Sequence, residues 1–240
     1  MFLLPSIITV GNMFCGYAAI MYAMRGDVFF AAPFIGVAFI LDMLDGRIAR
    51  MTGTSSAFGL QLDSLADVIS FGLAPALLAF SWGLSELGRW GWAAGFIFVV
   101  AAAMRLARFN IQTTTQVDKR YFIGMPSPSA AGVVAATVFA FPHGLTGLPQ
   151  LLAAVAVVVV PAILMVSTIR FRSFKTLNLG YQRSYLPIFF FAIFVVLIAT
   201  EPQYTLLALA YAYLLSAFIG QAMTKLRNRR ASLPPASTAP

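Results

Sequence analysis

Charged residues are scarce in this chain of 240 residues: Asp, Glu, Lys and Arg together make up only 10% of it. A soluble globular domain usually carries about 25% charged residues. Hydrophobic residues make up 60%, and the mean hydropathy is +0.85. A soluble fold needs a largely polar residue set for its surface, which this composition does not supply. The composition therefore excludes a soluble domain and favours an integral membrane protein.

Cysteine is almost absent as well, since Cys15 is the only one. A single cysteine excludes an intramolecular disulfide. The first apolar stretch has no basic segment before it and is long enough to span a membrane, so we do not expect a cleaved signal peptide. The net charge is +8, but basic residues that flank apolar spans usually set topology. We therefore expect no nucleic-acid partner.

Apolar runs of membrane-spanning length recur along the whole chain, and a bilayer core needs roughly 20 such residues per helix. The sequence predicts an all-α polytopic membrane protein with about eight transmembrane helices in one catalytic domain, residues 1–225. Residues 226–240 are expected to form a basic, then disordered, cytoplasmic tail. The predicted spans are 6–24, 28–48, 65–84, 90–110, 128–142, 149–168, 185–200 and 204–223.

The basic residues agree with this count. If both ends are cytoplasmic, all of the 16 Lys and Arg residues except Arg25 and Arg89 fall on the cytoplasmic side. This is the asymmetry that the positive-inside rule predicts. The sequence therefore predicts a multi-pass protein of the cell membrane with both termini in the cytoplasm.

Acidic residues number only eight, and four of them are aspartates between positions 42 and 67. Asp42 and Asp45 are three residues apart, and Asp63 and Asp67 are four apart, so each pair shares one face of a helix. A short turn between the two helices would bring all four together at the edge of the apolar core. Unpaired carboxylates at that depth are costly, so we expect a functional partner.

Divalent cations are the partner that this cluster favours, because four close carboxylates repel one another. All-oxygen ligands favour Mg²⁺ or Mn²⁺, and two such ions suit displacement at phosphorus. The small residues Gly46, Ala49 and Gly59 leave room for a ligand beside the metals, and Arg50 can bind phosphate. A packing role for the aspartates and a role in ion translocation are the alternatives.

The spacing of these residues forms a longer motif: D-x2-D-G-x2-A-R-x8-G-x3-D-x3-D, from Asp42 to Asp67. It resembles the signature of the CDP-alcohol phosphotransferases in full. The resemblance implies a six-helix membrane core, here with two further C-terminal helices, a homodimer, and a metal site that faces the cytoplasm. Other stretches, among them residues 105–110 and 124–128, resemble the phosphatidylserine synthase branch of that family.

The resemblance also implies roles for single residues. Asp42, Asp45, Asp63 and Asp67 would bind two divalent ions, Mg²⁺ or Mn²⁺, and Asp67 would also be the catalytic base. The CDP part of the donor would contact Gly46, Ala49, Arg50, Ser56 and Gly59. The implied substrates are CDP-diacylglycerol and L-serine, in contact with membrane lipids, and the products are phosphatidylserine and CMP.

The acceptor pocket is expected beside Asp67, because the carboxylate of serine needs a cation. We expect Arg108 to supply it, with Asn110, Ser127 and Ser129 as hydrogen-bonding partners. Two alternatives remain open at this point. The acceptor could be glycerol 3-phosphate or inositol phosphate, or the chain could be a cation-coupled secondary transporter that uses the same carboxylates.

Overall fold

Helices make up nearly all of the computed structural model, which describes residues 3–52, 56–114, 121–145, 147–167, 170–172 and 186–231. The α-helices are α1 (Leu3–Met24), α2 (Val28–Thr52), α3 (Ala57–Val68), α4 (Ala74–Trp82), α5 (Arg89–Thr114), α6 (Ser127–Ala140), α7 (Leu148–Val166), α8 (Leu186–Thr200) and α9 (Pro202–Ala231). Each of the eight predicted spans coincides with a helical stretch. The predicted all-α fold is therefore confirmed.

The third predicted span is one continuous helical stretch that begins earlier than expected, at Ala57. A π-helical turn, η1 (Ile69–Leu73), joins α3 to α4 without a break. Pro75 is the second residue after this turn and has no N–H to donate, which favours the wider hydrogen-bond pattern here. Asp63 and Asp67 consequently lie inside a helix, two and three turns from its start.

Within the described part of the chain, five helical stretches are long and apolar enough to cross a membrane: Ser6–Met24, Val28–Ile48, Ala57–Trp82, Arg89–Ile111 and Leu148–Val166. Helix α6 is apolar but shorter, with 14 residues. It coincides with the fifth predicted span, residues 128–142. These properties make the chain an integral, polytopic membrane protein.

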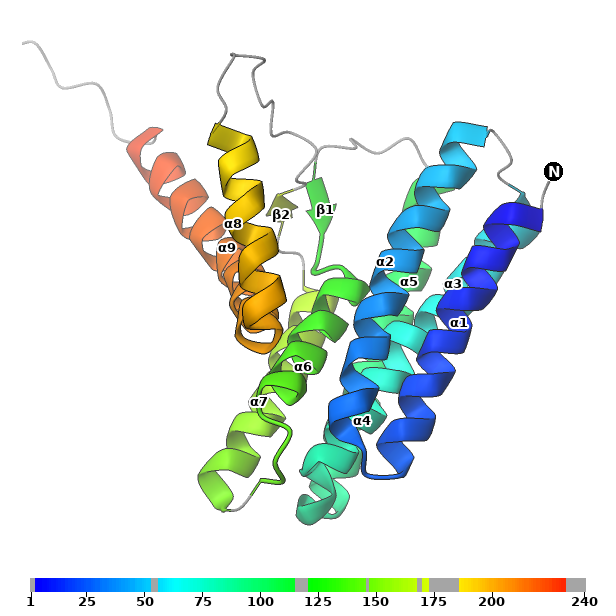
Figure 1. Cartoon of the computed structure of the whole chain (residues 1–240). Coiled ribbons are helices and arrows are strands. Elements are labelled where there is room, and N and C mark those ends of the chain that lie inside the picture. The colour runs from blue at the N-terminus through cyan, green and yellow to red at the C-terminus, as the bar shows by residue number, and fades with distance from the viewer. Residues whose placement is uncertain are drawn as a thin grey trace, which may run out of the picture.

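The two ends of the helix bundle are formed by different segments of the chain (Figure 1). The start of α1, the end of α2, the end of α5 and the last turns of α9 lie at one end. The other end holds the α1–α2 turn and the 3₁₀ turn η2 (Leu84–Leu87). Trp90 and Trp92, both highly exposed, lie at this second end. Exposed tryptophans at a helix end are typical of a membrane interface.

Small residues let the central helices approach closely. Ala19 and Ala23 of α1 and Ala31 and Ala38 of α2 are almost completely buried, at 1% exposure or less. Membrane helices associate through such small residues, because apolar side chains gain little by leaving lipid. The close α1–α2 pair forms one wall of the aspartate cluster described below.

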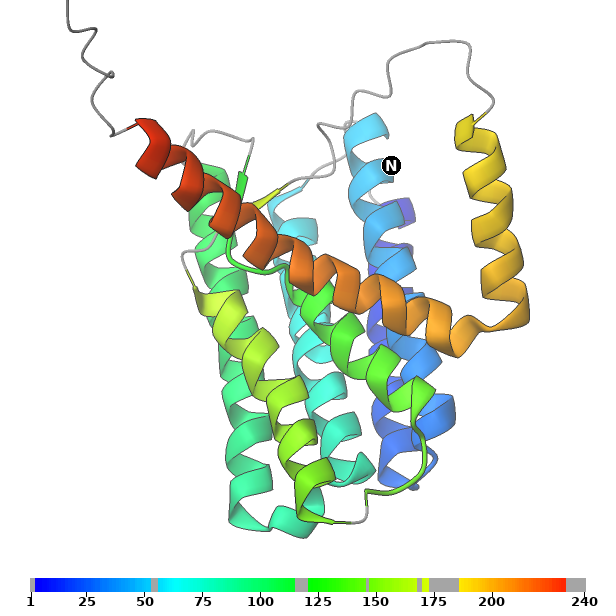
Figure 2. The same cartoon turned by 90° about the vertical axis from the view of Figure 1, so that its left-hand side faces the viewer.

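Helices α8 and α9 lie outside the main bundle. Helix α9 crosses α6 obliquely and packs on it, whereas α8 packs on α9 and stands away from α1–α7 (Figure 2). Helix α9 also continues to Ala231, so the first part of the predicted tail from residue 226 is helical. Residues 232–240 lie outside the described part of the chain.

A two-stranded antiparallel sheet was not predicted. Strand β1 (Tyr121–Ile123) pairs with β2 (Arg170–Arg172), with Phe122 opposite Phe171. Gly124 follows β1 with a positive φ of 86°, and a side chain there would collide with the carbonyl of Met165. The glycine therefore allows the chain to pass close to the end of α7 before α6 begins.

Candidate active site

Three carboxylates converge between α2 and α3. Asp42, Asp63 and Asp67 each offer an oxygen, and these oxygens lie within 4.8 Å of one another. Asp42 and Asp63 are half-buried, and Asp67 is buried. The helical spacing of the two pairs places them as predicted, because only four residues separate α2 from α3. Three like charges at this distance repel strongly unless a cation lies between them.

Asp45 lies beside this group but is held differently. It is close enough to Asp42 and Asp63 for electrostatic repulsion. Its Oδ2 accepts a hydrogen bond of 2.6 Å from the hydroxyl of Thr9 on α1. Both residues are buried, so this short bond to a carboxylate is worth about 1.5–3 kcal/mol. Thr9 thereby fixes the orientation of Asp45 toward the rest of the cluster.

A second polar residue of α1 supports Asp67. Asn12 is completely buried, and its Nδ2 donates to Oδ1 of Asp67 over 3.4 Å. The Asn12 backbone carbonyl accepts a 3.0 Å bond from the Ser70 hydroxyl in the π-turn. Gly16 makes this approach possible, because a Cβ there would lie 2.8 Å from the Ser70 Cα. Helix α1 is thus pressed against the π-turn beside Asp67.

The carboxylate oxygens fit a divalent metal. Oδ1 of Asp63 is buried and has no hydrogen-bond partner among the described residues. A buried carboxylate oxygen without a partner costs free energy, and a cation within the cluster would satisfy it. Hard divalent ions prefer such oxygen ligands. The cluster could therefore hold a divalent cation through Asp42, Asp63 and Asp67, with Asp45 adjacent.

The residues predicted to contact CDP surround this cluster in part. A Cβ built on Gly46 meets nothing within 4 Å, so there is open space next to the carboxylates. Ser56 caps the start of α3 by accepting a 2.9 Å bond from the Gly59 N–H, so it stabilises the helix that carries Asp63. The side chains of Ala49 and Arg50 lie outside the described part.

Arg105 is the basic residue that the fold brings to the carboxylates. It lies in the C-terminal half of α5 and is close enough to Asp42 and Asp67 for electrostatic attraction. Its Nη1 donates to the Ser127 hydroxyl over 2.8 Å, and its guanidinium lies 5.6 Å from the ring centre of Phe109. These contacts hold the guanidinium beside the aspartates.

The four residues predicted for the acceptor pocket have different surroundings. Ser127 is completely buried and binds Arg105, and Ser129 hydrogen-bonds Tyr213 of α9. Asn110 donates to the Ser64 hydroxyl over 2.9 Å, which ties α5 to α3. Arg108 is half-buried one turn beyond Arg105. The structure therefore brings Ser127 to a cation, Arg105, and Ser129 to Tyr213.

The sequence-based interpretation assigned no role to Thr9, Asn12 or Arg105. A usable signal existed for the first two, because polar side chains three residues apart share one face of an otherwise apolar span. For Arg105, helical geometry offered a choice between two arginines three residues apart. Only the packing of α5 against α3 and α6 decides which of them faces the carboxylates.

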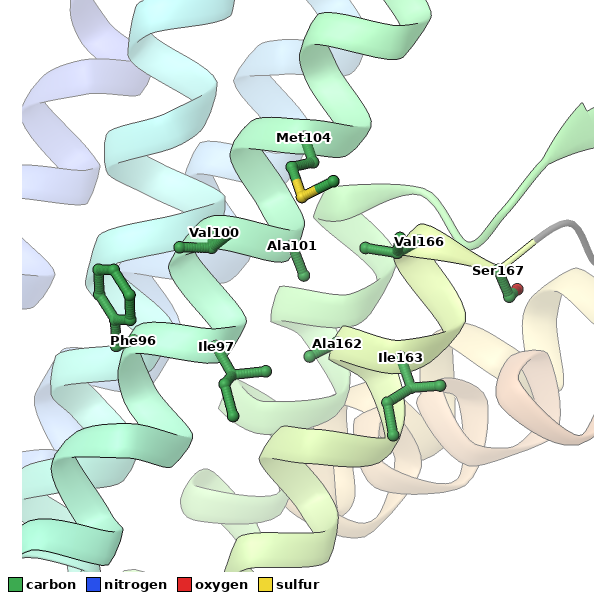
Figure 3. Close-up of a pocket in the computed structure, with 9 residues that line it drawn as sticks. All are labelled: Phe96, Ile97, Val100, Ala101, Met104, Ala162, Ile163, Val166 and Ser167. Atoms are coloured by element: carbon green, nitrogen blue, oxygen red, sulfur yellow. The ribbon is translucent and has the colours of Figure 1, made fainter.

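A separate hollow of about 530 Å³ lies between α5 and α7. Figure 3 shows side chains of both helices around it, and all but Ser167 are apolar: Phe96, Ile97, Val100, Ala101, Met104, Ala162, Ile163, Val166 and Ser167. Such a lining suits a lipid chain and not a hydrated nucleotide or a metal.

Fold and site together define an integral membrane protein with a buried carboxylate cluster, suited to a divalent cation, at the edge of the bilayer. Comparison with known proteins gives the family. A sequence model of the CDP-alcohol phosphatidyltransferases matches residues 2–169, which hold all four aspartates, Arg105 and Ser127. The chain therefore belongs to the CDP-alcohol phosphatidyltransferase family and is an enzyme of that class, as its motif predicted.

Curated relatives are similar over most of the chain. The CDP-diacylglycerol–serine O-phosphatidyltransferase of Helicobacter pylori is 42% identical over 177 residues, covering 73% of this chain and 74% of that protein. The protein of the same name from Bacillus subtilis is 38% identical over 127 residues, covering 53% and 70%. The archaetidylserine synthase of Methanothermobacter thermautotrophicus is 34% identical over 170 residues, covering 70% and 69%.

Proposed function

We propose that this enzyme transfers the phosphatidyl group of CDP-diacylglycerol to the hydroxyl of L-serine, giving phosphatidylserine and CMP. The observation that carries the proposal is the convergence of Asp42, Asp63 and Asp67 beside Arg105. This arrangement provides a binding site for a divalent cation next to the positively charged side chain of Arg105. The names of the similar proteins, which act on serine or form archaetidylserine, support the choice of acceptor.

The reaction is a displacement at phosphorus. The serine oxygen forms a bond to the phosphorus that carries diacylglycerol, and the bond from that phosphorus to the CMP oxygen breaks. Asp67 accepts the proton of the serine hydroxyl, and Asn12 orients its carboxylate. One or two bound divalent ions would neutralise the pyrophosphate and the departing CMP. Gly46 leaves space for the nucleotide beside the carboxylates.

Arg105 is suited to the carboxylate of the acceptor. A guanidinium binds a carboxylate through two parallel N–H bonds. Its other partners here are neutral, namely Ser127 and the ring of Phe109, so it keeps its charge for a ligand and for the nearby aspartates. A phosphorylated acceptor would need two or three converging cations, whereas a single guanidinium, that of Arg105, suffices for the carboxylate of an amino acid. The position of Arg105 beside the aspartates supports an amino acid as the acceptor.

We also propose that the site faces the cytoplasm. The carboxylates lie at the end of the bundle where α2 and α5 end and α9 finishes, and most basic residues belong to that end. Such an arrangement agrees with the positive-inside rule. The use of Mg²⁺ or Mn²⁺, the binding of two ions and the assembly of a homodimer stay predictions that follow from the family resemblance.

The experiment that tests this function follows CMP release by the purified protein in detergent–lipid micelles with CDP-diacylglycerol and labelled acceptors. We expect incorporation of label from serine, loss of activity with EDTA, and recovery with Mg²⁺ or Mn²⁺. Incorporation of glycerol 3-phosphate without serine would contradict the proposed acceptor. No CMP release under any condition, together with cation-dependent uptake in liposomes, would favour the transporter.

Two arginine variants extend the same assay. Arg105→Gln should raise the KM for serine by about tenfold or more, since a bond to a charged group is worth about 1.5–3 kcal/mol. Arg108→Gln is the matched control one turn away, and its KM for serine should stay within about twofold of the unmodified enzyme. A raised KM for serine in Arg108→Gln, with an unchanged KM in Arg105→Gln, would instead support Arg108 as the residue that binds the acceptor, as the sequence predicted.

A further inference from the structure

Helix α9 lies beyond residues 2–169, the part that matches the family, yet one of its side chains reaches the active site. Tyr213 is half-buried against the helical core, hydrogen-bonds Ser129 and is close enough to Arg105 for electrostatic interaction. Arg105 in turn interacts with Asp67. A tyrosine from the last helix is thus linked to Asp67, the proposed base, through a single intervening side chain, that of Arg105.

The packing of α9 explains how Tyr213 reaches this position. Ala210 and Leu214 are four residues apart, share one face of α9 and pack against the core. At 100° per residue, Tyr211 and Tyr213 project on the two sides of that face. Tyr211 lies 3.1 Å from the Thr137 hydroxyl, whereas Tyr213 bonds Ser129 near the start of the same helix, α6. The two tyrosines therefore bond two different positions along α6 and fix the position of α9 on it.

Hydroxyl groups from α6 and α9 lie on one side of Arg105. Ser127 accepts a hydrogen bond from its guanidinium, and Tyr213, which bonds Ser129, is close enough to Arg105 for electrostatic interaction. A hydroxyl can accept one hydrogen bond and donate another, so Tyr213 can accept from Ser129 and donate to a ligand on Arg105. One positive charge surrounded by hydroxyl donors matches a carboxylate, which has one negative charge, better than a phosphate.

We propose that Tyr213 is a specificity-determining residue: its phenol hydroxyl donates a hydrogen bond to the carboxylate of the amino-acid acceptor held by Arg105. Helix α9 would thus be a part of the acceptor pocket and not merely an additional membrane helix. This inference rests on the proposed function for the identity of the acceptor. It goes beyond that function by assigning acceptor selection to a segment outside the part that matches the family.

Tyr213→Phe tests the proposal, because it removes the hydroxyl and keeps the ring. The KM for serine should rise about tenfold or more, the effect of one hydrogen bond to a charged group, while the KM for CDP-diacylglycerol stays within about twofold. Tyr211→Phe is the matched control from the same helix. It removes the bond to Thr137 and should leave both KM values within about twofold.

Two results would overturn the role of Tyr213. One is an unchanged KM for serine in Tyr213→Phe, and the other is an equal rise of both KM values, which indicates a general loss of structure. The proposed function fails separately, when the unmodified enzyme uses glycerol 3-phosphate and not serine. In that case the KM for glycerol 3-phosphate decides the role of Tyr213, and an unchanged value in Tyr213→Phe overturns it.

Discussion

At the scale of single residues, the cost of placing carboxylates at the edge of a bilayer determines how this site is built. An ionised aspartate in the middle of a membrane helix costs about 2.5–3.5 kcal/mol on insertion scales. Here Thr9 and Asn12 donate to Asp45 and Asp67, and Arg105 supplies an opposite charge nearby. The aspartates lie on α2 and α3 and their partners on α1 and α5, so the site depends on the packing of four helices.

Asp67→Asn should abolish turnover, because asparagine cannot take the proton of the acceptor hydroxyl. General-base catalysis contributes about 10²–10⁴-fold, so we expect a loss in kcat of at least a hundredfold. Metal-dependent binding of CDP-diacylglycerol should persist, since Asp42 and Asp63 remain. Glu86→Gln, at an exposed acidic residue on the opposite end of the bundle, is the control. Full activity in Asp67→Asn would show that another group is the base.

The sequence predicted which aspartates form the cluster, but it did not predict which side chains of α1 and α5 contact them. Asp42, Asp63 and Asp67 converge as expected, because the i,i+3 and i,i+4 spacings fix their helix faces once the two helices are antiparallel. The partners on α1 and α5 depend on how far those helices are rotated in the bundle. No local pattern encodes that rotation, which explains why Arg108 was predicted where Arg105 faces the carboxylates.

At the scale of helices and turns, the contact between α1 and the π-turn positions Asp67. The contact needs a glycine, because a Cβ on Gly16 would lie 2.5 Å from the Ser70 Oγ and 2.8 Å from its Cα. A π-turn inside an α-helix often occurs at a functional site. Here it follows Asp67 directly and presents Ser70 to the backbone carbonyl of Asn12.

Gly16→Ala should push α1 away from the π-turn. Overpacking of this kind costs about 1–3 kcal/mol, so we expect a lower midpoint of thermal unfolding and reduced activity. Gly36→Ala is the matched control in α2, because a Cβ there meets nothing within 4 Å. Alanine is the better helix former, so this control should be at least as stable as the unmodified chain. Equal stability of the two variants would mean that the α1 contact is not needed.

The elements themselves were largely predictable. Runs of apolar residues between basic or Gly/Pro-rich segments gave every helix, with ends that differ from the predicted ones by up to eight residues. The largest differences are the end of the last helix, at Ala231 and not near residue 223, and the start of the third span, at Ala57 and not near residue 65. The start of the third span could not be predicted because the residues around Asp63 are polar. A hydropathy pattern cannot distinguish a functional polar stretch from a loop.

At the scale of the whole molecule, the distribution of charge indicates its orientation in the membrane. The end of the bundle near Met51 carries the aspartates and most arginines, whereas Ser85, Trp90 and Trp92 lie at the other end. The proposed cytoplasmic site follows from this asymmetry. The apolar hollow between α5 and α7 is lined by side chains of both helices (Figure 3).

Cysteine labelling would check the orientation. Met51 is 82% exposed and Ser85 is exposed, and the native Cys15 is buried, so background labelling should be low. In intact cells, a membrane-impermeant thiol reagent should label Ser85→Cys at once and Met51→Cys only after the membrane is permeabilised. Labelling of Met51→Cys in intact cells, with protection of Ser85→Cys, would place the site on the outer side and contradict the proposal.

The sequence by itself determined the membrane character, the helices and the motif that places the chain in its family. These properties depend on local composition and spacing, which act over one or two helical turns. Only the tertiary structure decided which partners reach the aspartates: Thr9 and Asn12 from α1, Arg105 from α5 and Tyr213 from α9. The physical reason is that helix rotation and crossing result from the packing of small residues across the bundle, which no single segment encodes.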